Sequence, residues 1–342
     1  MSTAGDLRDP ELLRVATGSV ELCRVRPDER VVVYTDEGAD QAIAAAWYSA
    51  CVVRGSDVSL VRARARPDET DPPSAAVAAM IEADVVFDVA SSDQGYAPSM
   101  KSIMGSGTRM LQILMPAAVV ARRAPDPVGS WRADVSADVL RGAGTVRVTT
   151  PRGTDLRAHL SAERPLDVAR GYVTEPGQWD SFGTSLIACA SLETSVQGHL
   201  AIDGPLILLP DASFVPDSPI NCEVVRGRIA SLNTSHAAAE TLDAWLRSFD
   251  DPEAYVFSHI GWGLDPHATI DDDELTSWES LFAGVMVAFG ANDSPNLGGA
   301  VHSLAHMDGL LLGASLWLDD RPIVLDGAFA PGSGLEDAGG QE

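Results

Sequence analysis

Apolar residues in the first third of the chain form short runs that alternate with one longer segment of helical length. Residues 30–34 (RVVVY) and 57–61 (DVSLV) are typical of buried strands. Between them, residues 41–55 (QAIAAAWYSACVVRG) predict an apolar helix that ends at Gly55. Two strands joined by a helix normally pair in parallel, so this order predicts a parallel sheet with a right-handed crossover.

The same pattern extends to about residue 125. Residues 6–26 predict an opening helix, since Asp9 and Pro10 are typical of a helix start. Residues 75–83 predict another helix and residues 84–90 a third strand. The chain has no GxGxxG motif after these strands, so nothing in it predicts a dinucleotide site.

Polar residues follow two of the predicted strands. Asp36 and Glu37 lie where a strand ends and a helix begins, and capping of the helix N-terminus is the favoured role for them over chemistry. Residues 91–111 follow the third strand, at the edge where open α/β sheets bind ligands. They include Tyr96 and Lys101, the only lysine in the chain, which are candidate substrate contacts; the alternative is a solvated loop.

A change of composition at residues 121–131 (ARRAPDPVGSW) predicts an interdomain linker, because it holds two prolines and a glycine. We therefore expect an N-terminal parallel-sheet α/β domain over residues 1–125 and a β-rich α+β domain, catalytic and metal-binding, over residues 126–330. The Gly-rich, acidic residues 331–342 predict a disordered tail.

The second domain is predicted to consist mainly of strands. Residues 145–160 predict a hairpin that turns at residues 151–153 (PRG). Two helices are expected to interrupt the strands, one over residues 236–249 and one over residues 273–290, which begins with acidic residues.

The stretch from Phe289 to Asp308 holds the first candidate metal ligands. It ends in His306-Met307-Asp308, which leads into small and branched residues that predict a strand. Residues i and i+2 of a strand point to the same face, so His306 and Asp308 are expected about 6–7 Å apart along it. An imidazole and a carboxylate at that spacing can close on one metal ion.

A second fragment supplies another histidine. Residues 255–263 predict a short apolar strand that ends in His259 and a Gly-x-Gly turn. Two histidines and one aspartate, with no cysteine nearby, are the ligand set of a non-haem Fe(II) site. His302 ranks below His259, because on a strand it lies too far from His306 to share a small ion, and Gly298-Gly299 disfavours a helix there.

These residues resemble one known family. HIGWG at residues 259–263, Gly290-x-Asn292 with Gly298-Gly299 after it, and the H-x-D of residues 306–308 resemble the 2,5-dihydroxypyridine 5,6-dioxygenases over about residues 20–330. That family consists of Fe(II) ring-cleaving enzymes that share a fold with the M29 metallopeptidases of the aminopeptidase T type.

The resemblance implies a mononuclear Fe(2+) enzyme with His259, His306 and Asp308 as ligands. Its substrates would be O2 and a small hydroxylated N-heteroaromatic such as 2,5-dihydroxypyridine, and its product N-formylmaleamate. The family also implies a homo-oligomer. Members often carry a histidine near the position of Tyr96, and its absence here leaves the acid–base partner open.

Glu175 lies in TEPGQWDSF, residues 174–182, which resembles a family stretch close to the active site. A carboxylate buried beside Trp179 and Phe182 could accept a proton from a substrate hydroxyl. The alternative is an exposed loop glutamate.

Two other functions use the same fold or site. An M29-type aminopeptidase needs two metals and more carboxylates, but residues 182–185 (FGTS) contain no glutamate, and His259 stands where the peptidases' E-x-G-x-G motif has its glutamate. The other alternative is a non-catalytic oligomeric binding protein with a vestigial metal site.

Composition excludes some partners. The net charge of −25 over 342 residues disfavours nucleic acid and anionic membrane surfaces, because like charges repel. No apolar run has the length of a membrane span, and no signal peptide is visible. The scattered cysteines, Cys23, Cys51, Cys189 and Cys222, indicate reduced thiols, so a cytoplasmic protein is expected.

Overall fold

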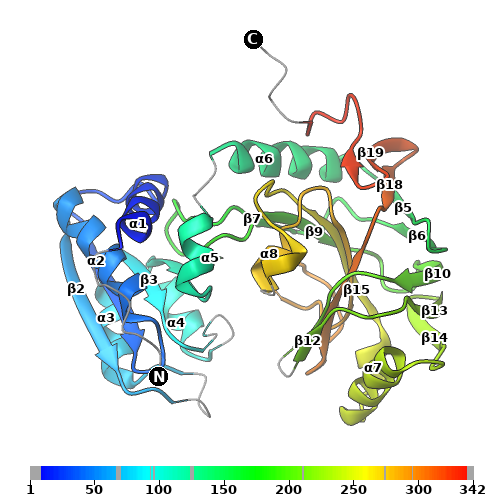
Figure 1. The fold of residues 1–342 in the computed structure, drawn as a ribbon, viewed down its shortest axis with the longest axis horizontal. Helices are drawn as coiled ribbons and strands as arrows, with labels where there is room; N and C mark the ends of the chain where they lie inside the picture. Colours follow the sequence, from blue (N-terminus) through cyan, green and yellow to red (C-terminus); the bar gives the residue numbers. More distant parts are fainter. Residues whose placement is uncertain are drawn as a thin grey trace. The chain divides into compact units, whose positions relative to one another are not determined.

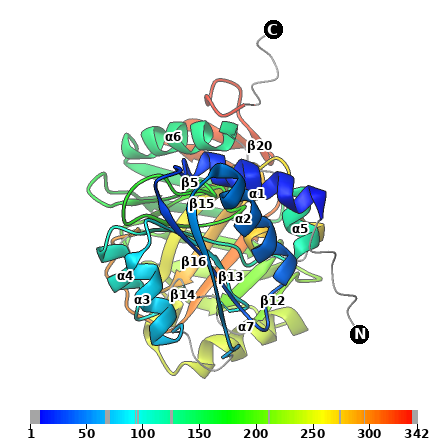
Figure 2. The same ribbon diagram turned by 90° about the vertical axis from the view of Figure 1, so that its left-hand side faces the viewer.

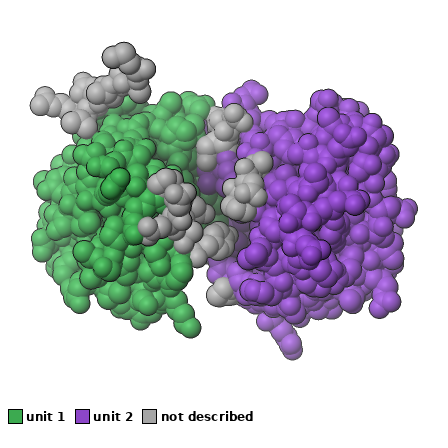
Figure 3. Space-filling view, turned by 90° about the horizontal axis from the view of Figure 1, so that it is seen from below, with its two compact units in different colours: residues 1–127, 169–184 green, residues 128–168, 185–342 purple. Residues whose placement is uncertain are grey.

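The structure of the protein is a computed structural model that describes residues 9–66, 71–92, 94, 97–123, 127–209, 212–272, 275–294 and 296–336. It divides into two compact units (Figure 3). The first unit is Met1–Pro127 with Ala169–Thr184, and the second is Val128–Val168 with Ser185–Glu342. The chain first passes from one unit to the other after Pro127, two residues beyond the predicted boundary at residue 125. Residues 169–184, which were expected in the second domain, belong to the first unit.

The first unit is built on a five-stranded sheet in the order β2-β1-β3-β4-β8, and its neighbouring strands pair in parallel. This confirms the predicted parallel α/β architecture. The strands are β1 (Arg30–Asp36), β2 (Asp57–Ala63), β3 (Val85–Val89), β4 (Arg109–Gln112) and β8 (Trp179–Ser181). The helices are α1 (Pro10–Leu22), α2 (Gln41–Arg54), α3 (Ser74–Glu82), α4 (Met100–Gly105) and α5 (Ala117–Arg122).

Both faces of this sheet are covered, which explains the unbroken apolar character of its central strands. Val31 and Val33 of β1 pack in one cluster with α1 and α2, which lie side by side (Figure 2). Val32 and Tyr34 pack in another cluster with Met80 of α3. The side chains of β1 therefore alternate between two helical layers, as the pleat of a strand requires.

The second unit contains two larger sheets (Figure 1). The eight-stranded sheet has the order β14-β13-β10-β6-β5-β18-β19-β20, and the seven-stranded sheet has the order β12-β11-β17-β16-β15-β9-β7. The strands of the first are β5 (Thr145–Thr149), β6 (Asp155–His159), β10 (Gln197–Ile202), β13 (Ile220–Val225), β14 (Arg228–Leu232), β18 (Ser315–Leu318), β19 (Arg321–Leu325) and β20 (Ala328–Phe329). Those of the second are β7 (Leu166–Ala169), β9 (Leu186–Ala190), β11 (Leu206–Leu209), β12 (Ala212–Phe214), β15 (Phe257–Gly263), β16 (Val285–Gly290) and β17 (His306–Leu311).

One apolar cluster takes side chains from both sheets, with Val148 and Leu156 from one and Ile187 and Val287 from the other. Around the sheets lie α6 (Pro127–Arg141), α7 (Ala237–Ser248), α8 (Leu275–Glu279) and the 3-10 turns η1 (Pro252–Tyr255) and η2 (Ile270–Asp272). The predicted β-rich α+β character is therefore present, and the hairpin expected at residues 151–153 joins β5 to β6. No helix in the described ranges has the length and apolar character that a membrane crossing requires.

Three predictions about local structure were wrong. The helix expected over residues 273–290 is only the short α8, and Val285–Gly290 form strand β16, whose six residues are all buried. The Gly-x-Gly turn after His259 does not exist, because β15 continues through Gly261 to Gly263. The expected linker at residues 121–131 is largely helical, since α5 ends at Arg122 and α6 begins at Pro127.

The predicted disordered tail also differs in part from the structure. Leu335 is fully buried in the apolar cluster of the second unit, and Ser333 is 1% exposed. The last residues, 337–342, lie outside the described ranges.

Candidate metal centre

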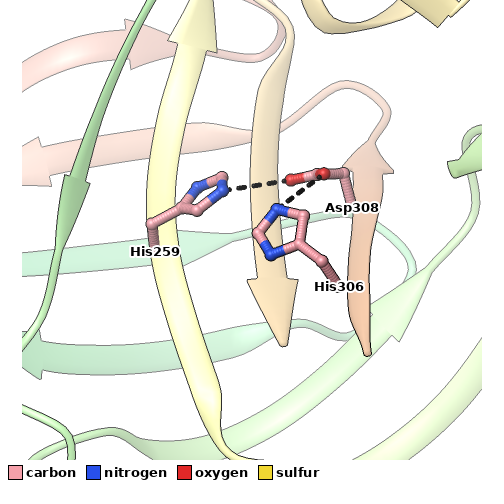
Figure 4. A group of neighbouring side chains, drawn as sticks. All are labelled: His259, His306 and Asp308. Atoms are coloured by element: carbon pink, nitrogen blue, oxygen red, sulfur yellow. Dashed lines mark ion pairs between the residues drawn. The ribbon is translucent and has the colours of Figure 1, made fainter. Parts of the chain in front are cut away.

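His259, His306 and Asp308 come from two strands that flank a third. His259 lies on β15, the other two lie on β17, and β16 runs between these strands. Ala288 of β16 pairs directly with Asp308, so both side chains point to the same face, where the small methyl group leaves space. The three side chains converge on that space (Figure 4).

An irregularity in the sheet places His259. Phe257 pairs with Phe289 and Ile260 pairs with Val287, so two residues of β15 lie opposite one residue of β16. Such a bulge bends a strand and changes the direction of a side chain. The glycines after it allow close strand contact, since a Cβ on Gly261 would lie 2.2 Å from the carbonyl oxygen of Ile187 on β9.

The three side chains lie within the reach of a single metal ion. Asp308 Oδ1 lies 3.3 Å from His259 Nε2, and Asp308 Oδ2 lies 3.2 Å from His306 Nε2. One ligand atom from each residue can be chosen so that all three lie within 4.8 Å of one another. The predicted shared face of His306 and Asp308 is thus present.

The pKa values of the two histidines shift in opposite directions, because burial dominates at His259 and the contacts with Asp308 and the Ala291 carbonyl dominate at His306. Burial lowers the pKa of His259 to about 4, against the charge of Asp308. Burial also acts to lower the pKa of His306, but Asp308 and the Ala291 carbonyl outweigh it, and the pKa is raised. Burial would raise the pKa of Asp308, yet the two imidazoles lower it, so the carboxylate remains ionised.

These residues fit a divalent metal ion. Asp308 is 3% exposed, and no residue in the described ranges hydrogen-bonds to its Oδ1 or to Nδ1 of His259. A buried polar atom without a partner is costly, and a cation beside Asp308 would remove that cost at the carboxylate. Two imidazoles and one carboxylate are also the donor set typical of non-haem Fe(II) sites.

The other predicted site residues lie in the first unit or outside the described ranges. Lys101 is exposed on α4, and Tyr96 is not among the described residues. Glu175 is exposed in the loop between β7 and β8, where it accepts a hydrogen bond from Thr174 Oγ1 at 3.3 Å. The expected burial of Glu175 beside Trp179 and Phe182 was therefore wrong, because Gln178 instead caps the loop backbone at residues 174 and 175.

Two further histidines of the second unit are surface residues. The side chain of His302 is 87% exposed and pairs with Asp293 at 2.8 Å. His267 is 60% exposed and lies 3.3 Å from Asp265. Neither belongs to the His-His-Asp group, in keeping with the rank given to His302.

Sequence reasoning missed one carboxyl group near the triad. Asp167 lies on β7, in the same seven-stranded sheet, and accepts a hydrogen bond from Asn296 Nδ2 at 3.2 Å. Burial raises its pKa, the bond from Asn296 opposes this, and the charge of Asp308 raises it further. The only signal in the sequence was a single acidic residue within the strand LDVA.

Comparisons with known proteins identify the family of the chain. The family model of the 2,5-dihydroxypyridine 5,6-dioxygenases (NicX) matches residues 11–331. A protein named 2,5-dihydroxypyridine 5,6-dioxygenase from Pseudomonas putida KT2440 is 30% identical over 240 residues, which are 68% of this chain and 67% of the relative.

Solved structures show the same fold. The structure of 2,5-dihydroxypyridine dioxygenase from Pseudomonas putida KT2440 superposes with a TM-score of 0.82 at 26% identity, covering 94% of this chain and 98% of the other. The aminopeptidase T (AmpT) of Thermus thermophilus superposes with a TM-score of 0.66 at 15% identity, covering 95% and 100%. At that identity the second likeness shows the fold alone.

Proposed function

Because the chain belongs to the 2,5-dihydroxypyridine 5,6-dioxygenase family, we propose that it opens the ring of a hydroxylated N-heteroaromatic such as 2,5-dihydroxypyridine with O2. The product would be N-formylmaleamate, which contains both atoms of the O2 molecule. The observation that carries this proposal is the buried cluster of His259, His306 and Asp308, within a chain that matches the family along nearly its full length.

We propose Fe(II) as the ion at this cluster, in a reaction of the extradiol type. Both imidazoles can present a neutral nitrogen, and the Asp308 carboxylate offsets one of the two positive charges of the ion. Three protein ligands leave coordination positions open, which a ring-cleaving enzyme needs. Bound iron would supply the redox chemistry that allows O2 to react with an aromatic ring.

Two carboxyl groups are proposed as acceptors of the substrate hydroxyl proton. Glu175 is proposed from the resemblance of its loop to the family. Tyr96 and Lys101 stay proposed substrate contacts, because they follow the third strand, at the edge where open α/β sheets bind ligands. Asp167 is proposed because it lies in the sheet of the triad and interacts electrostatically with Asp308. Separate Glu175→Gln and Asp167→Asn variants distinguish them, since only the acceptor should lose rate at full iron content.

The test is anaerobic reconstitution with Fe(II), followed by oxygen-uptake assays over a panel of hydroxypyridines. The wild-type protein should consume O2 with 2,5-dihydroxypyridine in a one-to-one ratio and form N-formylmaleamate. Asp308→Asn protein, treated identically, reports the background uptake of unbound iron. Absence of O2 consumption above that background with every compound would overturn the substrate class.

We also propose a homo-oligomer and a cytoplasmic location. The support for the first is family resemblance. The support for the second is that all four cysteines are buried and free, as in a reducing compartment. Sedimentation of a monomer at micromolar concentration would overturn the homo-oligomer.

A further inference from the structure

The loop between β16 and β17, residues 291–305, begins and ends at the candidate metal centre. Gly290 pairs with His306 at the ends of the two strands, and Ala291 N–H donates to the Ala305 carbonyl at 2.9 Å. The Ala291 carbonyl accepts two hydrogen bonds, from His306 Nδ1 at 3.0 Å and from Ser258 Oγ at 2.7 Å. A carbonyl only accepts, so Nδ1 of His306 carries a proton and Nε2 is the nitrogen left for a metal.

The peptide unit that carries this carbonyl is held from its other side. A trans peptide is planar, and its N–H points opposite to its C=O. The N–H of the Ala291–Asn292 peptide belongs to Asn292 and donates to the Val301 carbonyl at 3.0 Å. Whatever holds Val301 therefore also sets the direction in which the Ala291 carbonyl faces His306.

The Asn292 side chain holds Val301. Its Oδ1 accepts from Val301 N–H at 2.8 Å, and its Nδ2 lies 3.5 Å from the carbonyl of Ser258. The side chain is 1% exposed. The loop folds tightly around it, because a Cβ on Gly299 would lie 2.1 Å from the Asn292 amide.

An ion pair between Arg164, before β7, and Glu193, after β9, holds the same loop in place. Arg164 Nη2 donates to both carboxylate oxygens of Glu193, at 2.8 and 2.7 Å, and the Ala300 N–H donates to Glu193 Oε1 at 3.0 Å. Asn292 Nδ2 lies 3.5 Å from the same oxygen. Burial acts to raise the pKa of Glu193, but Arg164 and the Ala300 N–H outweigh it and the pKa is lowered, so the carboxylate stays charged.

We propose that Asn292 is a positioning residue of the metal centre, which clamps Val301 and thereby orients the Ala291 carbonyl that makes His306 present Nε2. The inference rests on the metal site of the proposed function. Partners of ligating histidines fix the tautomer and ring orientation, and their loss typically weakens metal affinity about 10- to 100-fold. Asn292 itself contacts neither His306 nor Asp308 through a hydrogen bond.

The test uses Co(II) binding by the full-length protein, measured by chelator competition and by the visible bands of the bound ion. Two variants disturb Asn292 by different means. Asn292→Ala removes the amide, and Gly299→Ala pushes it aside with a methyl group at a backbone conformation that alanine can adopt. Both should weaken Co(II) binding about 10- to 100-fold and alter the bands. Asn292→Ala also leaves the Val301 N–H without its acceptor and should lower the unfolding midpoint, so binding is measured on fully folded protein, well below that midpoint.

The control is His302→Ala, another truncation to alanine on the same loop, where the side chain is 87% exposed; it should bind Co(II) within about threefold of wild type. Unchanged affinity and bands in both Asn292→Ala and Gly299→Ala would overturn the positioning role. So would weaker binding with unaltered bands, because a loss of stability alone lowers affinity without changing the geometry around the bound ion. Wild-type protein that binds no Co(II), or His306→Ala protein that binds it equally well, would instead overturn the metal site itself.

Discussion

Two buried aspartates, one in each unit, differ in what surrounds them. Asp36, at the end of β1, and Asp308, on β17, are each 3% exposed. Asp36 accepts four hydrogen bonds, from the backbone N–H of Gly38 (2.8 Å), Ala39 (3.0 Å) and Ser91 (2.9 Å) and from Ser91 Oγ (2.9 Å). Asp308 faces two imidazoles, and its Oδ1 has no hydrogen-bond donor among the described residues.

The supply of donors, rather than burial, separates the structural carboxylate of Asp36 from the proposed metal ligand Asp308. Asp36 joins the ends of β1 and β3, and the protein itself satisfies its oxygens. The helix cap predicted for Asp36 was wrong, because the N-cap of α2 is Asp40, which accepts from Ala42 N–H at 2.9 Å. Oδ1 of Asp308 keeps acceptor capacity that the described part of the chain does not use. The same isosteric change to asparagine at both positions therefore gives a direct test.

Asp308→Asn should have the largest effect. Loss of the charged ligand should abolish stoichiometric Fe(II) binding and oxygen uptake together, and His259→Ala and His306→Ala should do the same. Iron content and O2 consumption measured on the same anaerobic samples check this. His302→Ala is the control and should keep both; an iron-replete His306→Ala protein or an iron-free His302→Ala protein would show that the triad is drawn through the wrong residues.

Glu175 is a third kind of carboxylate, exposed rather than buried, and Glu175→Gln tests its role. If Glu175 accepts the substrate proton, its loss should leave the iron content intact and slow turnover by about 100-fold. Steady-state rates of iron-replete protein measure this, with Asp167→Asn as the matched change within the sheet of the triad. A Glu175→Gln enzyme at full rate would remove Glu175 from the mechanism.

Asp36→Asn should affect stability and leave metal binding intact. An amide group offers one acceptor oxygen where the carboxylate offered two, so at least one buried donor loses its partner, at a cost of about 2 kcal/mol. A lower urea midpoint at wild-type iron content is the expected result. Loss of iron in this variant would contradict the distinction between the two aspartates.

The smallest expected effect is the release of one proton on metal binding. The pKa of His259 is lowered to about 4, so His259 is already neutral at pH 6.5, whereas the pKa of His306 is raised, so its protonated form predominates there. Metal binding at pH 6.5 should therefore displace at most one proton, from His306, and none well above its pKa. Apparent affinity falls as pH falls. Calorimetry in buffers of different ionisation enthalpy counts the protons, and release of two would contradict this assignment.

Features that depend on neighbours within the chain were predictable from sequence. The strand–helix–strand unit around residues 30–61 follows from apolar runs and the helix stop at Gly55, which has φ 87°. The shared face of His306 and Asp308 follows from the period of a strand. Asp9 caps α1 through its bond to Glu11 N–H at 2.9 Å, as its place before Pro10 indicated.

Features that depend on distant partners were not predictable. Val285–Gly290 pairs with β15 on one edge and with β17 on the other, and all six residues are buried. The segment therefore lacks the alternation of apolar and polar residues that marks a half-exposed strand, and it was interpreted as a helix. Gly261 lies close to β9 and Gly263 lies close to residues 280–281, so neither forms a turn, and these neighbours cannot be identified from the local sequence. The pairing of β8 with β4, which returns residues 169–184 to the first unit, spans about 70 residues along the chain.

The most direct test of the central claim is a crystal structure of the protein soaked anaerobically with Fe(II), with anomalous data collected on both sides of the iron edge. The account predicts one iron peak per chain, about 2 Å from a nitrogen of His259, Nε2 of His306 and an oxygen of Asp308. An iron peak held by other residues, or a fully soaked crystal with no peak between these three side chains, would contradict it.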